Sequence, residues 1–237
     1  MENEIQHADD FKLRCGSMAP VLKQLFIARI ITIAAPVLSI ILALASFSNG
    51  PVRFVIIAMI IVLAANVFYI IVLFRLGKYH DDFKYAAIIS ILSPVLSSIS
   101  KSLPNEPGLV VFLSILGAGL SLLLLLKFSN AMISTFERVD LALTSSWESY
   151  RTWMIGLSCG SIACFLLAFV PGINILAAIG AIVCGIGILA LIIWEVVLIN
   201  NSYQSMEAYS KQPDQVSPTA IDEAKPLAPE IPDLTEE

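Results

Sequence analysis

Long apolar runs alternate with short polar segments along the whole chain. Each of the six runs is close to the roughly 20 residues that a helix needs to cross the hydrocarbon core of a bilayer. Tight turns with Pro or Gly join the runs in successive pairs. The pattern therefore predicts an all-α, polytopic transmembrane bundle of six helices arranged as three consecutive hairpins, over residues 25–47, 52–75, 83–102, 108–128, 147–169 and 173–200.

The amino-acid composition indicates a membrane protein whose two terminal segments are polar. Of the 237 residues, 57% are hydrophobic and 14% charged, against about 25% charged in soluble domains. Residues Glu207 to Glu237 contain eight acids and two lysines and therefore have a net charge of −6. The whole chain has a net charge of −5, so the rest of it has a net charge of +1. Residues 204–237 are predicted to be a disordered, acidic, Pro-rich tail, and residues 1–24 a polar N-terminal segment.

The positions of the cations predict the orientation of the bundle. The three short turns that close the hairpins hold only Arg53 and Lys101 of the fourteen Lys and Arg residues. Cytoplasmic loops of membrane proteins carry an excess of Lys and Arg. We therefore expect both termini in the cytoplasm and an integral protein of a bacterial cytoplasmic membrane.

The third run is the shortest and the most polar. It contains Pro94 and a row of serines at helical spacing, namely Ser90, Ser93, Ser97 and Ser100. Such serines commonly donate to carbonyls of their own helix or to a neighbouring helix. The alternative is a wet pathway beside a helix broken at Pro94. If this run only dips into the bilayer, five helices span it and the tail lies on the opposite side.

Two interpretations compete for residues 129–151. Val139, Leu143, Trp147 and Tyr150 recur at helical spacing, which predicts a helix lying along the membrane surface. Ser145 and Glu148 instead fit a capping box that opens the fifth spanning helix. Residues 201–210 are predicted to prolong the sixth helix by a short polar extension.

Small residues in the last two runs predict a close helix contact. Counted from the turn at residues 170–172, Ala163 faces Gly180, Cys159 faces Cys184 and Gly156 faces Gly187. Small residues let helix backbones approach closely in lipid. The predicted seam comprises Gly156, Cys159, Gly160, Ala163, Gly180, Cys184 and Gly187. Cys159 and Cys184 lie at the same predicted depth, and the alternative for these two residues is a disulfide bond.

Glu195 is the only acid within an apolar run, because the uninterrupted apolar part of the fifth segment begins at Trp153. Its distance from the last turn places it near the inner edge of the bilayer, where simple exposure at the interface would require no partner. Arg29, Arg75 and Lys127 fall at a similar depth. Arg29 is the preferred partner for an ion pair because it lies furthest inside an apolar run.

Catalytic and cofactor motifs are weak in this sequence. Residues 156–160 match G-x-S-x-G, but that nucleophile motif requires a preceding strand and a nearby histidine base, and His7 and His80 lie outside the runs. The four cysteines have no metal-ligand spacing, so no cofactor or metal is expected. No basic cluster with interleaved aromatics suggests nucleic acid.

The expected function is therefore non-enzymatic. We expect a membrane interaction, scaffold or accessory subunit, with the lipid bilayer, other membrane proteins or a tail-binding cytoplasmic protein as partners. The alternative is a small transporter or channel subunit that uses the serine-rich face of residues 83–102.

Overall fold

The computed structural model describes residues 2–49, 53–102, 107–167, 170 and 172–212, and its regular elements in these ranges are all helices. They are α1 (Glu2–Asn49), α2 (Arg53–Leu76), α3 (Asp81–Lys101), α4 (Pro107–Phe136), α5 (Leu141–Leu167) and α6 (Asn174–Lys211). All six are long and apolar enough to cross a membrane. The three predicted hairpins form, because α1 packs on α2, α3 on α4 and α5 on α6. The predicted all-α transmembrane class is thus confirmed.

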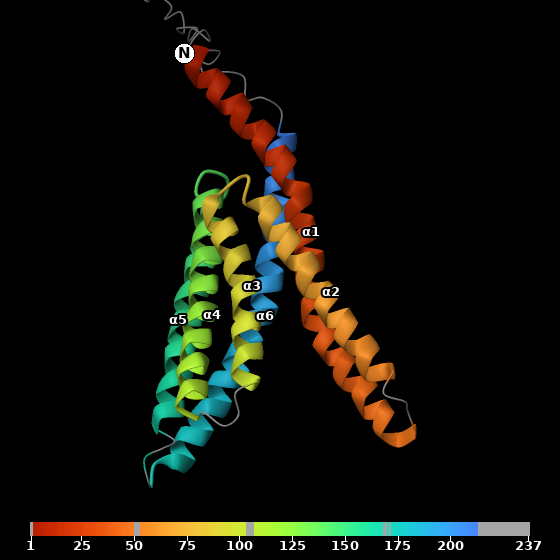
Figure 1. Ribbon diagram of the computed structural model, residues 1–237. Coiled ribbons are helices and arrows are strands. Elements are labelled where there is room, and N and C mark those ends of the chain that lie inside the picture. The colour runs from red at the N-terminus through yellow and green to blue at the C-terminus, as the bar shows by residue number, and fades with distance from the viewer. Residues whose placement is uncertain (1, 50–52, 103–106, 168–169, 171, 213–237) are drawn as a thin grey trace, which may run out of the picture.

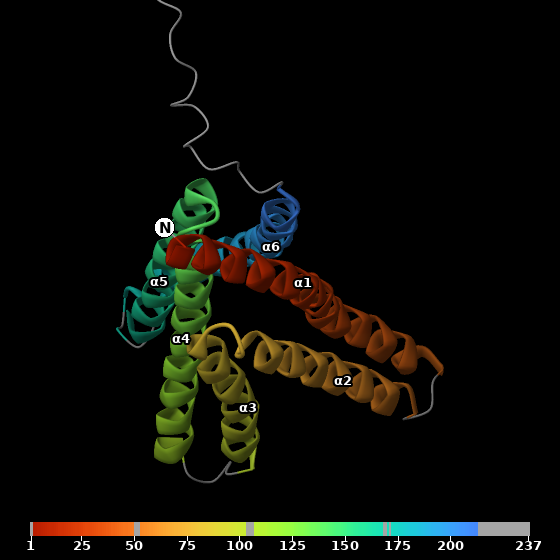
Figure 2. The same cartoon turned by 90° about the horizontal axis from the view of Figure 1, so that it is seen from above.

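The three hairpins meet at one end of the molecule and diverge from it in three directions (Figures 1 and 2). We call this end the apex. It holds the loop between α2 and α3, the loop between α4 and α5, and the C-terminal end of α6, and α1 begins beyond it. The tips of the hairpins lie at the other end and apart from one another. Contacts between α1 and α6, α4 and α5, and α2 and α3 join the hairpins.

The segment from 129 to 151 does not form a surface helix, so that prediction was wrong. Residues 129–136 complete α4, and α5 begins at Leu141 after a short turn. The predicted amphipathic stripe is buried against other helices, including Leu143, Trp147 and Tyr150. An apolar stripe covers a protein core as readily as a lipid surface, so its spacing did not distinguish the two.

The start of α5 also differs from the predicted capping box. Asp140 caps the helix, because the N–H of Leu143 donates to its Oδ1 at 3.0 Å. Ser145 therefore lies in the second turn of α5 rather than at its N-cap. Because α5 begins one turn earlier than predicted, Leu143 is helical and packs with Trp147 and Tyr150 inside the bundle. This packing explains the earlier start of the helix.

Helices α1 and α6 extend beyond the other helices at the apex (Figure 1). With 48 and 38 residues, they are about 72 and 57 Å long at 1.5 Å per residue, against a hydrocarbon core of about 30 Å. The projecting parts pack together, since the Phe11 and Tyr209 rings lie 5.8 Å apart. The predicted extension of the sixth helix is confirmed and reaches Lys211, into the segment assigned to the tail. Residues 213–237 of that tail lie outside the described residues.

The buried core lies at the apex. The largest fully buried side chains come from the apical parts of all six helices, and they include Leu22, Leu73, Phe83, Phe128, Trp147, Tyr150 and Ile199. Towards the tips, large apolar side chains are exposed, such as Met59 at 68%, Ile115 at 64% and Ile175 at 71%. Such side chains suit a lipid environment. Among the described residues, the buried contacts between hairpins therefore lie mainly at the apex.

Candidate functional site

Five aromatic rings form a continuous ladder across the apex, from α3 to α6. The centroid distances are 5.9 Å from Phe83 to Phe128, 5.7 Å from Phe128 to Trp147, 5.5 Å from Trp147 to Tyr150 and 6.1 Å from Tyr150 to Trp194. All four contacts are edge-to-face, a preferred arrangement for aromatic pairs. We call these rings the aromatic ladder; together they join four helices.

The apex also contains an ion pair between α1 and α6, with a buried carboxylate and a half-buried guanidinium. Arg29 Nη2 lies 2.6 Å from Glu195 Oε2, and the Tyr150 hydroxyl donates to the same oxygen at 3.1 Å. The side chains of Arg29 and Glu195 are 19% and 2% exposed. The Arg29 guanidinium also lies over the Tyr69 ring, 5.7 Å from its centroid. The alternative of a carboxylate exposed at the interface is therefore wrong.

These contacts join helices at the apex. Glu195 binds a guanidinium and a phenol, which are both hydrogen-bond donors, and no histidine or second carboxylate among the described residues is its partner. Across the part of the chain that the structure describes, no three His, Cys, Asp or Glu side chains are grouped as metal ligands. The ion pair joins α1 to α6 where the two helices cross. Tyr150 connects this crossing to the aromatic ladder, because its hydroxyl donates to Glu195.

The small-residue seam of the last hairpin exists, with a register one residue away from the predicted one. A Cβ on Gly180 would lie 2.7 Å from Cys164 Sγ, and one on Gly160 would lie 3.2 Å from Cys184 Sγ. Gly187 approaches Leu157 in the same way, at 2.8 Å from Cδ1. Four of the predicted residues therefore lie on the contact, namely Gly160, Gly180, Cys184 and Gly187.

The other three predicted seam residues face away. Ala163 and Cys159 are exposed, and a Cβ on Gly156 would meet nothing within 4 Å. The observed pairs are symmetric about Gly172, whose φ of 88° lies in the left-handed region that favours glycine. A shift of one residue rotates a helix face by about 100°. All four cysteines are free, so the disulfide alternative is also wrong.

We expect Gly180→Leu to weaken the α5–α6 contact. The new side chain would enter the space of Cys164, and overpacking costs about 1–3 kcal/mol. The measurement is the thermal unfolding midpoint of the purified protein in detergent. Gly185→Leu is the matched control, because a Cβ there meets nothing within 4 Å. Equal midpoints for the two variants would show that the seam does not stabilise the hairpin.

Of the four serines predicted to form a polar face on α3, one lines a cleft in the described structure. The Ser90 hydroxyl donates to the carbonyl of Ala86 at 2.9 Å, as expected for serines that bond their own helix. Ser90 and Pro94 line a cleft, whereas the half-buried Ser93 and Ser100 are not among its lining residues. The side chain of Ser97 lies outside the described part of the structure.

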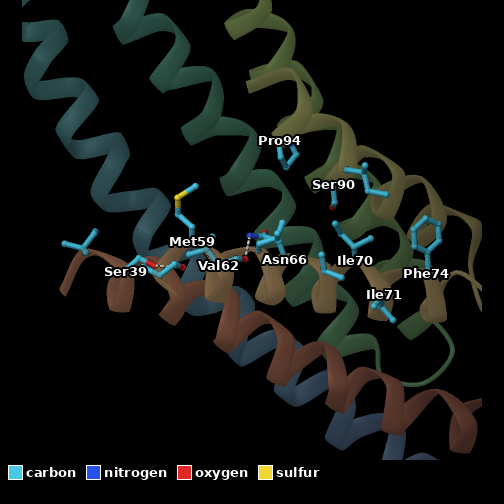
Figure 3. A pocket seen from close by; sticks show the side chains of 14 residues that line it. Ser39, Met59, Val62, Asn66, Ile70, Ile71, Phe74, Ser90 and Pro94 are labelled. Carbon is cyan, nitrogen blue, oxygen red and sulfur yellow. Dashed lines mark hydrogen bonds between the residues drawn. The ribbon is translucent and has the colours of Figure 1, made fainter. Parts of the chain in front are cut away.

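The cleft that Ser90 lines separates the α1–α2 hairpin from α3 (Figure 3). We call it the lateral cleft. Its volume is about 880 Å³, within the roughly 300–1,000 Å³ of typical ligand pockets. Its walls are apolar except for Ser39, Asn66 and Ser90. A smaller cleft of about 520 Å³ lies between α1 and α6 and has entirely apolar lining residues, such as Ile33 and Val197.

Asn66 was not singled out by the sequence analysis. It lies inside the second apolar run, and its side chain points into the lateral cleft (Figure 3). An isolated amide in the middle of an apolar run was the available signal, since polar side chains in spanning helices usually contact another helix.

Comparison with known proteins found no similar protein. No family model matches the chain, and no similar curated protein or solved structure was found.

Proposed function

We propose that the protein is a non-enzymatic membrane interaction protein, a scaffold or accessory subunit, which receives transmembrane segments between its spread hairpins. The lateral cleft is the observation that carries this proposal. Its walls are almost entirely apolar. Helices associate in lipid through close packing and a few hydrogen bonds, and an apolar cleft with isolated polar groups provides both.

The distribution of polar contacts supports a scaffold. At the apex, Glu195 is held by Arg29 and Tyr150, and Trp147 Nε1 donates to Ser202 Oγ at 3.0 Å. These groups bind one another and join helices. The apex thus acts as a fixed base, while the separated hairpins offer surface to partners.

A photoreactive amino acid in the cleft tests this function. Leu63 lines the cleft and Ile57, which is also exposed, is not among its lining residues. With the label at position 63, irradiation of native membranes should give discrete protein adducts that are absent with the label at 57. Adducts with lipid alone at both positions would contradict the proposal.

A second candidate function, a small transporter or channel subunit, rests on the position of Ser90 and Pro94. Both line the lateral cleft opposite α2. This function requires solute flux in proteoliposomes that contain the pure protein, and Ser90→Leu should reduce that flux. Absence of flux for inorganic ions and small metabolites would remove this candidate.

We further propose that both termini lie in the cytoplasm of a bacterial cell. The basis is the distribution of Lys and Arg given above. In a variant without native cysteines, Ser210→Cys should react with a membrane-impermeant thiol reagent only after the membrane is opened. Labelling of intact cells at this position, with the N-terminus inside, would contradict six spans.

A further inference from the structure

Asn66 lies near the middle of α2, a helix that is long and apolar enough to span a membrane. Helix α2 runs from Arg53 to Leu76, so Asn66 is about 15–20 Å from either end of the helix. With a hydrocarbon core of about 30 Å, headgroups and bulk water lie too far away to reach its amide. The side chain is half-buried and projects into the lateral cleft, opposite Pro94 of α3 (Figure 3).

The amide of Asn66 is incompletely satisfied. One N–H of Nδ2 donates to the carbonyl of Val62 at 2.8 Å. No further hydrogen bond of this side chain is made within the described ranges, although an Asn side chain has a second N–H and an acceptor oxygen. Both remaining groups must find partners at the depth where they lie, because unpaired polar groups are costly in hydrocarbon. An acyl chain offers neither a donor nor an acceptor.

A second copy of the chain offers both groups at the right depth. Two copies inserted in the same orientation carry Asn66 at equal depth, and their α2 helices run parallel about a two-fold axis. An amide is self-complementary, since the Oδ1 of each copy can accept the free N–H of the other.

The spacing of α2 fits such a pairing. Met59, Leu63, Asn66 and Ile70 all line the cleft and recur with the alternating spacing of four and three of a parallel helix pair. Met59 and Leu63 are 68% and 65% exposed and therefore free for contact. A single Asn in such a row fixes the register of parallel helices.

From these observations we propose that the lateral cleft binds α2 of a second copy, with the two Asn66 amides paired across the axis. The proposal rests on the proposed function, because it names the transmembrane segment that the cleft receives. Ser90 and Pro94 of α3 form the far wall against which the second α2 packs.

Disulfide cross-linking of the full-length chain in membranes tests this pairing. The four native cysteines are replaced by Ala, and Met59→Cys is compared with Ile57→Cys, which is exposed but is not among the residues lining the cleft. Oxidation should convert most of the Met59→Cys protein into a covalent dimer and leave Ile57→Cys monomeric. No dimer at position 59, in protein that accumulates normally, would overturn the proposal.

The role of the amide is tested by dimer affinity in liposomes, measured by energy transfer between labelled copies. Asn66→Leu should weaken dimerisation about tenfold, and Asn66→Gln should restore most of it. Met59→Trp provides a second test that leaves Asn66 intact, since its larger side chain should obstruct the pairing. Equal affinity in Asn66→Leu and the unaltered protein would overturn the amide pair.

The outcomes separate this inference from the function on which it rests. With the photoreactive label at position 63, adducts that contain another membrane protein and no second copy would overturn the second-copy proposal while supporting a scaffold. Phospholipid as the only cross-linked species would overturn both.

Discussion

Replacing Arg29 by Gln should lower the free energy of unfolding by about 3–5 kcal/mol, the usual cost of removing one partner from a buried ion pair. The variant leaves the Glu195 carboxylate, 2% exposed, with Tyr150 as its remaining hydrogen-bond donor. Reversible unfolding of the purified protein in detergent, followed by Trp fluorescence, measures the change. This is the largest effect that we expect from a single polar substitution.

Glu195→Gln should be milder than Arg29→Gln. The Arg29 side chain is 19% exposed, and its long chain lets the charged head move toward water. The double variant should lose less stability than the sum of the single losses, because both remove the same contact. Strict additivity would show that the pair contributes no coupling energy.

The bridge between Lys127 and Asp82 gives a matched control. Its atoms are 2.9 Å apart, but the two side chains are 36% and 19% exposed. Neither side chain is as buried as Glu195, which is 2% exposed, and ion pairs that water reaches are usually worth less than about 1 kcal/mol. Lys127→Gln should therefore change the unfolding free energy far less than Arg29→Gln, and a similar loss would mean that burial does not explain the Arg29 effect.

The hairpins and the Arg29–Glu195 contact followed from the sequence for physical reasons. Long apolar runs have few alternatives to spanning helices, since backbone groups must be satisfied within the bilayer. Charges inside such runs are few, and Arg29 and Glu195 fall at similar depths from opposite ends of the chain. Depth alone therefore limited the possible partners of Glu195 to three cations.

Rotation of a helix about its axis was much harder to predict than its depth. The α5–α6 seam was placed one residue away because the axis of symmetry lies at Gly172, and the backbone of a turn is not encoded by the count of residues. The same limit applies to Trp147 and Tyr150. Their spacing fits a surface helix and a buried one equally, and tertiary packing decided between them.

The spread of the three hairpins could not be predicted at all from hydropathy. A lipid-facing side chain and one that lines a cleft are equally apolar, as Leu63 and Ile57 show. Leu63 and Ile57 lie on different faces of α2, and which face borders a cleft depends on the direction in which the α1–α2 hairpin leaves the apex (Figure 1). That direction depends on contacts such as the packing of α1 on α6, which joins residues from opposite ends of the chain.

Trp147→Ala should lower the free energy of unfolding by about 3–5 kcal/mol, the typical cost of truncating a buried large aromatic residue. Trp147 is fully buried, at 0% exposure, and contacts the rings of Phe128 and Tyr150. The change would interrupt the aromatic ladder at its middle and leave the Ser202 hydroxyl without its indole donor. Chemical denaturation in detergent measures the loss, with Tyr and the remaining Trp residues as the fluorescent probes.

Two further variants distinguish the contributions of burial and of the hydrogen bond to the stability loss expected for Trp147→Ala. Trp153→Ala is the control on the same helix, because this side chain is 61% exposed and surface substitutions usually change stability by less than about 0.5 kcal/mol. Trp147→Phe keeps most of the ring contacts and removes the hydrogen bond to Ser202, so it should cost about 1–2 kcal/mol. If Trp147→Ala is as mild as Trp153→Ala, the aromatic ladder does not join the hairpins. The stability of the apex must then come from the Arg29–Glu195 contact and the packing of α1 on α6.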